Sequence, residues 1–391
     1  MNYLSLCTYH RRSTDLKDIM PPAFDSNDLN KHVIFPWRKV VPLADEVVRF
    51  NEFKRQIDEK GIVVPVTLVS AGDYEGTLLR FLRARQLVTA KALKMLEDTL
   101  AFRAQEKVDL LLLKPVAPEA VANIRKHQAC SHLGVDLEGH PLFLDRPGYT
   151  DIDGMLSSGV KEDDVMTYHL QELEWFANYY TWVRSEQCGH TVDKKTVVVD
   201  GAKTSVSLFM KIRTLFSRIS TVDQANYPEN VNKIVIMNAG WFFSGVFRLI
   251  TPLLDVHTRE KIAILNSSRS DFDALHAVVA PSHLPKVFQG EMKDEDSFTV
   301  CGDTQLAHFY AEYDCEIRRK QQLVEEGATM AEAMLPTFVR TAALNGTLQV
   351  CEPSEAASSP FASCPGLMAG VIATLSRRDQ MQKNVLDLMK V

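Results

Sequence analysis

The hydrophobic pattern on either side of residue 250 is the most informative feature of this chain. Residues 233–238 form a short apolar run rich in β-branched side chains, and residues 261–265 form a second run of the same kind. Such runs predict buried strands. The segment between them is apolar on nearly every side. A strand, a helix and a strand at this spacing predict a crossover unit of a parallel sheet.

The middle segment has no polar face, although a crossover helix normally exposes a polar stripe to water. Its apolar residues are Trp241, Phe242, Phe243, Val246, Phe247, Leu249, Ile250, Leu253 and Leu254. It is too short to span a bilayer, which needs about 20 apolar residues. Two interpretations stay open: a helix buried beneath another part of the chain, or a helix that roofs an apolar cavity and meets a membrane when it moves away.

The N-terminal part of the chain is expected to be helical after a tail. Residues 1–40 are polar and contain prolines, which is typical of a poorly structured tail. Residues 41–115 show helical spacing and predict a lobe of helices. The first of these helices is expected at residues 41–56. Another is expected to be capped by Thr89, whose hydroxyl can accept a backbone N–H.

Residues 116–300 alternate strands with helices, which is the pattern of an α/β domain. Strands are expected at 141–145 and 194–200, and helices at 162–186 and 205–222.

Beyond residue 300 the strand pattern is lost. Residues 301–350 predict a helical extension, with an amphipathic helix at 303–326, and residues 351–391 predict a linker followed by an amphipathic segment.

Composition narrows the class of protein. The chain has 391 residues and a net charge of −6, which argues against nucleic-acid binding driven by phosphate contacts. Its seven cysteines are scattered and form no CxxC pair, which indicates a reducing compartment. No transmembrane run and no signal-peptide pattern occur, so a cytoplasmic protein is expected.

No motif predicts an enzyme or a metal site. Nucleotide-binding glycine loops, the GxSxG elbow and the HExxH helix are missing from the sequence. His127, Cys130 and His132 carry atoms that could bind a metal, but their spacing matches no established zinc pattern. These three residues are expected in an exposed loop before the first strand.

Six segments, in this order, carry a family resemblance. They are LLRFLRAR at residues 78–85, HPLFLDRPG at 140–148, VVVD at 197–200, NYPENVNKIVIMNA at 226–239, WFFSGVFRLITPLLDVHTREKIAIL at 241–265 and LPKVFQGE at 284–291. Together they resemble the CRAL-TRIO lipid-binding family, most closely its phosphatidylinositol/phosphatidylcholine transfer proteins. The resemblance covers about residues 45–292.

This resemblance implies a fold and a ligand. The expected fold class is α/β, with a mixed, largely parallel sheet that floors a hydrophobic lipid pocket, an N-terminal helical lobe and C-terminal helices. One phospholipid is expected to lie in the pocket as the ligand, with no cofactor and no catalytic residue. The helix of Trp241, Phe242, Phe243, Val246, Phe247, Ile250 and Leu254 corresponds to the family's mobile gate.

The resemblance also implies headgroup-binding residues. The family holds inositol phospholipid headgroups with a basic residue after the LLRFL helix and with a Thr and a Lys after the gate, which correspond to Arg85, Thr258 and Lys261. Glu229 matches an acidic residue near the headgroup. A phosphate needs a cation and hydrogen-bond donors, which agrees with this set.

Two departures from the family pattern affect the ligand. The second basic residue after Arg85 is Gln86, which weakens the charge that faces a phosphate. The hydroxyl pair that binds the choline lipid is replaced by Lys195 and Val197, which should face the same side of one strand. Binding of phosphatidylcholine is therefore in doubt, and Lys195 could favour an anionic second ligand.

Three functions stay open at this point. The first is a carrier or presenter of phosphatidylinositol that contacts membranes transiently. The second is a carrier of another small hydrophobe, such as a tocopherol, a retinoid or a sterol. The third is an adaptor that binds a protein partner through residues 301–391, with the lipid as a regulatory signal.

Overall fold

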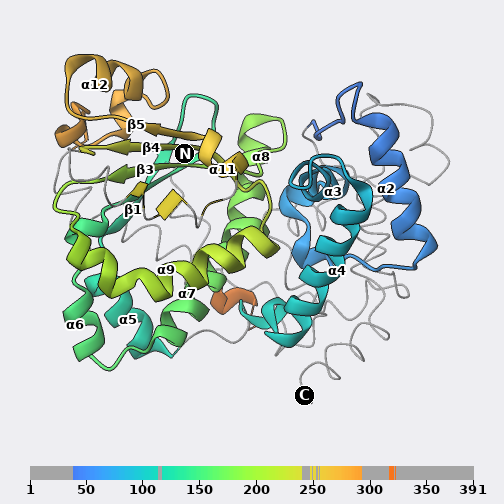
Figure 1. Ribbon diagram of the computed structural model, residues 1–391, viewed down its shortest axis with the longest axis horizontal. Coiled ribbons are helices and arrows are strands. Elements are labelled where there is room, and N and C mark those ends of the chain that lie inside the picture. Colours follow the sequence, from blue (N-terminus) through green and yellow to red (C-terminus); the bar gives the residue numbers. More distant parts are fainter. Residues whose placement is uncertain are drawn as a thin grey trace, which may run out of the picture.

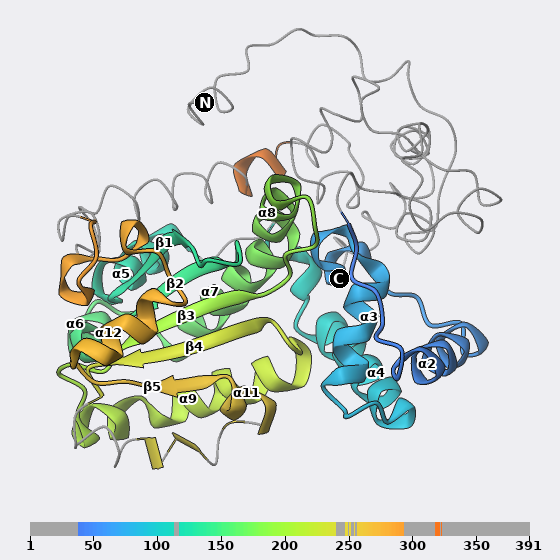
Figure 2. The ribbon, with the colours of Figure 1, turned by 90° about the horizontal axis from the view of Figure 1, so that it is seen from above.

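The structure is a computed structural model. It describes residues 38–112, 117–239 and 256–292, together with Phe247, Arg248, Ile250, Thr251, Leu254, residues 317–320 and Gln322. Figures 1 and 2 show three N-terminal helices on one side of the molecule and a sheet with its own helices on the other.

The N-terminal lobe consists of α2 (Val47–Glu59), α3 (Tyr74–Arg83) and α4 (Thr89–Gln105). The apolar faces of these helices meet in one core, because each helix carries large apolar side chains at three- and four-residue spacing. The core residues include Phe50, Phe53, Ile57, Leu78, Leu79, Phe81, Leu82, Leu93 and Leu96, none of them more than 7% exposed.

Two details of the lobe correct the sequence analysis. The first helix begins at Val47 rather than at residue 41, because the Glu46 carboxylate, which also binds Arg83, accepts a hydrogen bond from the Leu43 N–H and holds a turn there. Thr89 does not cap α4. The N-cap is Val88, whose carbonyl oxygen accepts hydrogen bonds from the backbone N–H groups of Lys91 and Ala92.

The sheet has five strands in the order β1-β2-β3-β4-β5. They are β1 (Cys130–Val135), β2 (Pro141–Asp145), β3 (Lys195–Asp200), β4 (Val231–Met237) and β5 (Ile262–Ile264). The β1–β2 pair is antiparallel and the other three pairs are parallel. The predicted mixed, largely parallel sheet is confirmed.

The prediction that Cys130 and His132 lie in an exposed loop before the first strand is wrong. Residues 130–135 form β1, and Cys130 and Ser131 at its start are buried. The sequence pattern does not predict this strand, because Ser131, His132 and Gly134 interrupt the apolar residues. The residue pairing also shifts between His132 and Gly134, which marks a bulge in the strand.

The remaining helices surround the sheet. They are α5 (Pro118–His127), α6 (Ile152–Ser157), α7 (Glu162–Trp175), α8 (Thr181–Cys188), α9 (Val206–Asn226), α11 (Val256–Glu260) and α12 (Arg269–His276). The predicted helix at 162–186 is α7 and α8 in one run, joined by η7 (Phe176–Tyr180), a π-helical turn. The predicted helix at 205–222 is α9, and the Ser205 hydroxyl caps it by accepting a hydrogen bond from the Leu208 N–H at 3.0 Å.

The short 3₁₀ turns complete the connections between these elements. They are η3 (Val66–Leu68), η4 (Ser70–Gly72), η5 (Val108–Leu110), η6 (Pro147–Tyr149), η9 (Pro281–His283) and η10 (Lys286–Phe288).

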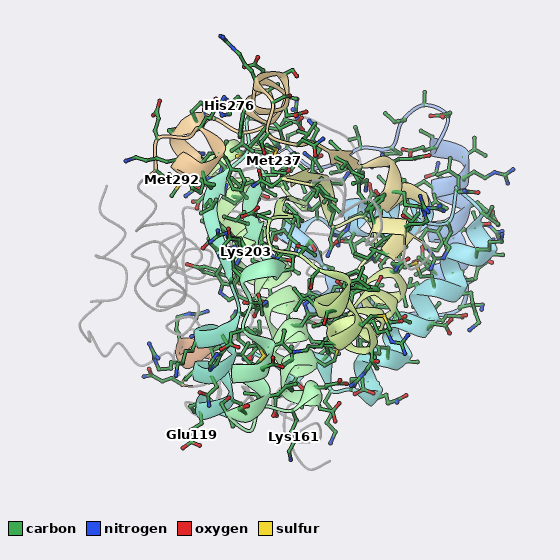
Figure 3. All side chains as sticks on the ribbon, turned by 60° about the vertical axis from the view of Figure 1, so that its left-hand side comes forward. Glu119, Lys161, Lys203, Met237, His276 and Met292 are labelled. Atoms are coloured by element: carbon green, nitrogen blue, oxygen red, sulfur yellow. The ribbon has the colours of Figure 1, made fainter. Side chains whose placement is uncertain are left out.

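The two faces of the sheet differ in packing. One face, which we call the packed face, consists of Leu133, Leu142, Leu144, Val198, Val235 and Met237, each no more than 2% exposed. Phe272 and Leu275 of α12 pack against it, as do Leu284 and Phe288 from the end of the domain. Figure 3 shows Met237 of this face in the same part of the molecule as His276 and Met292.

The opposite face, which we call the open face, carries the alternate residues of the same strands, because successive side chains of a strand point to opposite sides. Its members Phe143, Lys195, Val197, Val199, Ile234 and Ile262 are all half-buried, and Ile264 is 45% exposed. Ile236 is the exception at 5%, and Phe247 of the predicted gate packs beside it.

The predicted gate and the C-terminal part are described only in places. Trp241, Phe242, Phe243 and Val246 lie outside the described residues. Phe247, Arg248 and Ile250 are helical, and the parallel pairing of β4 with β5 agrees with the predicted crossover.

Of the predicted helix at 303–326, residues 317–320 are described and helical. Ile317 is 5% exposed and packs against the cluster of Leu112, Ile124 and Tyr168.

Candidate functional site

A cavity of about 600 Å³ lies between the N-terminal lobe and the sheet domain. We call it the interlobe cavity. It is lined by Ala84, Arg85, Gln86, Lys91, Phe216, Ile219, Ser220, Asp223, Gln224, Tyr227, Pro228, Glu229, Asn230, Val231, Ile234, Leu254, Thr258 and Lys261. Figures 1 and 2 show α11 on the side of the sheet that faces α3 and α4. The volume lies within the range of about 300–1,000 Å³ that is typical of small-molecule sites.

Four residues that the sequence analysis selected lie around this one cavity. They are Arg85, Thr258, Lys261 and Glu229, which come from three separate parts of the chain. The Lys261 Nζ lies 2.7 Å from the Glu229 Oε2, and both side chains are partly buried. Lys261 is held at the sheet edge because its carbonyl oxygen accepts a hydrogen bond from the Ile234 N–H at 3.0 Å.

The backbone of Glu229 is unusual. Its φ of 57° lies in the left-handed region, which side chains other than glycine seldom adopt. The turn that contains it connects α9 to β4 directly after the Tyr227-Pro228 pair. Such strain is often found where a side chain must be aimed at a particular place, and here the carboxylate meets Lys261.

Arg85 reaches the cavity from the short loop between α3 and α4. The loop turns sharply because Gln86 and Leu87 both have positive φ, at 53° and 59°. The Leu87 N–H donates to the carbonyl oxygen of Leu82 at 3.0 Å, which closes the end of α3. The Arg85 guanidinium bonds the carbonyl oxygen of Ala84 at 2.9 Å. Within the described part of the chain, no carboxylate lies at ion-pair distance from it.

Sequence reasoning missed further polar residues of the cavity, of which Lys91 and Asp223 are the most important. Lys91 lies in the first turn of α4, is exposed, and has no ion-pair partner among residues 38–112, 117–239 and 256–292. Asp223 of α9 is already bound by His169 at 2.8 Å. The start of a helix just after the Arg85 loop was the available signal for Lys91.

Part of the lining of the interlobe cavity is apolar. Phe216 and Ile219 of α9 contribute to it, together with Ile234 and Leu254. The apolar stripe of α9 consists of Leu208, Phe209, Ile212, Leu215, Phe216 and Ile219, and only Phe209 in this set is buried. A helix that keeps most of its apolar stripe half-buried does not pack like a core helix.

Three of the predicted gate residues can be placed. Leu254 lines the interlobe cavity, Phe247 packs beside Ile236 and Ala239, and Ile250 is half-buried. The predicted second-ligand residues Lys195 and Val197 both lie on the open face, as strand alternation requires. They do not line the interlobe cavity, but Val231 does, and it is the β4 partner of Lys195.

A buried ionic cluster joins the two lobes next to the cavity. The Arg103 guanidinium of α4 contacts the Glu174 carboxylate of α7 at 2.8 and 2.9 Å and also contacts Asp109. The hydroxyl of the cavity residue Tyr227 donates to Glu174 at 2.8 Å. Burial opposes the charge of Arg103, but the carboxylates of Glu174 and Asp109 outweigh it and raise the Arg103 pKa. The cluster fixes α4 against α7 and positions Tyr227.

Neither a metal site nor a membrane span is found among the described residues. No group of three or more metal-binding side chains occurs there, and His132 instead lies in β1 with its ring packed edge-on against Phe143. No helix in the part of the chain that the structure describes is long and apolar enough to cross a bilayer.

Two models of one family match the chain. The CRAL/TRIO domain matches residues 125–290, and the CRAL/TRIO N-terminal domain matches residues 50–98. Together these ranges cover more than half of the chain. The chain belongs to the CRAL/TRIO family. The lobe of α2, α3 and α4 and the sheet domain are therefore the two parts of a CRAL/TRIO protein.

Several CRAL/TRIO relatives are phosphatidylinositol/phosphatidylcholine transfer proteins. SFH9 of Arabidopsis thaliana, which carries that name, is 30% identical over 256 residues, which are 64% of this chain and 43% of that protein. SFH7 of the same plant, also so named, is 32% identical over 214 residues, which are 54% and 38% of the two proteins. The SEC14 cytosolic factor of Kluyveromyces lactis is 29% identical over 248 residues, which are 63% and 79%.

The chain spans less than half the length of these two plant relatives. Among solved structures, the crystal structure of Sfh5 aligns with 71% of this chain and 99% of its own at 14% identity, with a TM-score of 0.46.

Proposed function

We propose that this CRAL/TRIO protein binds one phospholipid, with phosphatidylinositol as the preferred ligand, and carries or presents it between membranes. The observation that carries the proposal is the composition of the interlobe cavity. Its lining combines the cations Arg85 and Lys261 and the Thr258 side chain with the apolar side chains of Phe216, Ile219, Ile234 and Leu254. A headgroup with one phosphate and several hydroxyls matches the polar lining residues, and acyl chains match the apolar ones.

The ion pair of Lys261 and Glu229 contributes to binding of the headgroup. In the absence of a ligand, the ion pair satisfies a partly buried ammonium that would otherwise lack a counter-charge. An incoming phosphate competes for Lys261, and the released Glu229 carboxylate can then accept hydrogen bonds from inositol hydroxyls. The same two side chains therefore serve the empty and the loaded protein.

Lys91 compensates for Gln86. A phosphate diester between Arg85 and Lys261 would have only one cation on the side of the N-terminal lobe, since Gln86 is neutral. Lys91 adds a second cation on that side of the cavity. Because Lys91 is exposed, its contribution is that of a surface charge, roughly 0.2–1 kcal/mol.

The transfer needs no covalent step, and the protein acts without an enzyme mechanism. Exposing hydrocarbon to water costs about 0.8 kcal/mol per CH₂ group, so two acyl chains oppose spontaneous escape by on the order of 20 kcal/mol. Half-buried apolar side chains on the open face and on α9 offer the acyl chains an apolar surface in place of water. The protein contacts the membrane transiently while the lipid crosses.

Lipid transfer between vesicles tests this proposal. Phosphatidylinositol transfer is measured for the wild-type protein, Lys261→Ala and Lys91→Ala, with Lys94→Ala as the matched control because Lys94 pairs with Asp98 on the surface of α4. Lys261→Ala should lower transfer about tenfold or more, since a charge-assisted hydrogen bond contributes roughly 1.5–3 kcal/mol. Lys91→Ala should lower it about two- to fivefold.

Equal transfer by Lys261→Ala and Lys94→Ala would contradict the headgroup assignment. Mass spectrometry of lipid extracted from the purified protein separates the alternatives. A phospholipid mass supports the proposal, whereas a tocopherol, retinoid or sterol mass supports a carrier of another hydrophobe. Unchanged transfer after deletion of residues 301–391 would show that a partner bound there is not needed for transfer.

A further inference from the structure

The ammonium of Lys195 lies among aromatic rings on the open face. Its Nζ is 5.6 Å from the ring centre of Phe143 and 5.7 Å from that of Phe176. Both distances are within the roughly 6 Å at which a cation is attracted to the face of an aromatic ring. Phe143 comes from the neighbouring strand β2, and Phe176 begins the π-helical turn η7.

Further aromatic rings pack around the π-helical turn and against Phe176. Tyr180 at its end packs against Phe176 with ring centres 6.4 Å apart and against Trp175 at 5.1 Å. Tyr179 packs on Trp175 at 5.5 Å. Such turns inside α-helices often occur at functional sites, because the extra residue redirects side chains.

Two carboxyl groups act on the same ammonium. Burial raises the pKa of Asp145 to about 6, while a backbone hydrogen bond and the charge of Lys195 lower it. Burial also raises the pKa of Glu172, and Lys195 is one of several groups that oppose this rise. Neither carboxylate reaches ion-pair distance, and the ammonium of Lys195 has no hydrogen-bond or ion-pair partner in the described part of the chain.

A quaternary ammonium cannot donate hydrogen bonds. Proteins bind it with the faces of aromatic rings, with carboxylates farther away. A lysine normally seeks direct hydrogen bonds, since its ammonium has three donors. The Lys195 ammonium makes none with the described residues and instead occupies a site whose chemistry suits a trimethylammonium group. The site adjoins the interlobe cavity, because the β4 partner of Lys195 is the cavity residue Val231.

We propose that Lys195 is an internal substitute for a ligand cation: it fills an interior ammonium site, and thereby excludes choline phospholipids and selects lipids without a cationic headgroup. This inference rests on the proposed function, since it assumes that the open face borders bound lipid. A trimethylammonium would have to enter beside Lys195, where two like charges repel strongly in a partly dry interior. Removing the charge leaves the aromatic rings and carboxyl groups free to accept choline.

Competitive loading tests the inference. The full-length wild-type protein and its variants are incubated with vesicles of equal parts phosphatidylinositol and phosphatidylcholine, re-isolated, and analysed by mass spectrometry for both bound lipids. Lys195→Met and Lys195→Gln remove the cation, and Lys195→Arg keeps it. Lys203→Met is the matched control, because Lys203 lies over the Tyr149 ring at 4.3 Å outside the interior.

Lys195→Met and Lys195→Gln should raise the ratio of bound phosphatidylcholine to phosphatidylinositol at least tenfold, whereas Lys195→Arg and Lys203→Met should leave it within about twofold of wild type. Phosphatidylinositol loading serves as the folding control for each variant. Wild-type protein that loads both lipids equally, or neutral variants that load phosphatidylinositol alone, would overturn the inference and leave the proposed function intact. Failure of every form to load either lipid would overturn both.

Discussion

The packed face and the open face of the sheet are made of the same strands but serve opposite purposes. Val198 is fully buried beneath α12 and its neighbours, whereas Val197 and Val199 on either side of it are half-buried. Both faces are mostly apolar, so hydrophobicity alone does not distinguish them. The difference in burial means that one face stabilises the domain, while the other leaves apolar surface partly accessible, which under the proposed function receives the lipid.

The ionisable residues follow the same division. On the packed face, the Asp200 carboxylate accepts hydrogen bonds from the Arg146 guanidinium at 3.1 Å, the Asn238 amide at 2.8 Å and the Ala202 N–H at 3.1 Å. On the open face, the Asp145 carboxylate has a backbone hydrogen bond with Arg146, and neither Asp145 nor the Lys195 ammonium has an ion-pair partner in the described part of the chain. Charges of the packed face are satisfied by neighbouring groups of the protein, and under the proposed function those of the open face act on a ligand.

The largest expected effect is on stability, from Leu144→Ala on the packed face. Leu144 is 0% exposed and packs within the cluster that contains Phe272 and Leu275. Truncating a buried leucine leaves a cavity and should lower the free energy of unfolding by about 2–5 kcal/mol. Urea denaturation, monitored by circular dichroism, measures this free energy of unfolding. Ile262→Ala on the open face is the control and should lose less than half as much; equal losses would show that the two faces are packed alike.

The next effect is a pH dependence that belongs to the open face. The Asp145 pKa is raised to about 6 in the folded protein against 3.8 in the unfolded chain. The folded state therefore holds this proton more tightly, and stability falls as the pH rises from about 4 to about 6, then stays level. Asp145→Asn removes this loss, so the variant should gain stability over wild type across that window, at most about 3 kcal/mol.

Thermal unfolding at a series of pH values measures this difference. Asp200→Asn is the contrasting control, since it disturbs a satisfied carboxylate and should destabilise the protein at neutral pH by about 1–3 kcal/mol. Parallel pH profiles for wild type and Asp145→Asn would refute the assignment of the raised pKa to this carboxyl group.

The smallest effect comes from the most closely matched pair, Val198→Ala and Val197→Ala. The two residues are adjacent on β3 and differ only in the face that they occupy. Val198→Ala removes fully buried methyl groups and should lower the unfolding free energy by about 2 kcal/mol, and Val197→Ala by less than about 1 kcal/mol. Denaturation midpoints decide between these values. A larger loss for Val197 would mean that the open face is a packed core.

Much of the fold could be predicted because it depends on local patterns. The strands β2, β3, β4 and β5 and the helix α9 follow from apolar runs and periodicity that are visible in the chain. The strand β1 was missed, because its polar residues and its bulge are explained only by pairing with β2. The cap of α4 was placed one residue too late, since hydrogen bonding of Val88, not the hydroxyl of Thr89, begins the helix.

Some residues of the candidate site could likewise be predicted from the sequence, and others could not. Arg85, Thr258, Lys261 and Glu229 were selected from motifs, and the structure brings all four to one cavity. Lys91 was missed because its one local signal, the start of a helix after the Arg85 loop, does not show that the packing of α4 brings it to the cavity. The gate residues Trp241, Phe242, Phe243 and Val246 remain predictions, as do the domain boundaries and the roles of residues 1–37 and of the tail beyond residue 300.

By itself, the sequence determined the order of β2 to β5 with the long helices between them, the apolar segment after β4 and the types of side chain available to hold a headgroup. These features depend on neighbours along the chain. Only the tertiary structure decided which apolar residues are packed and which stay accessible, and which charges meet. Burial and electrostatic interaction depend on distances in space, so Val197 and Val198 differ in environment although the sequence presents them as equals.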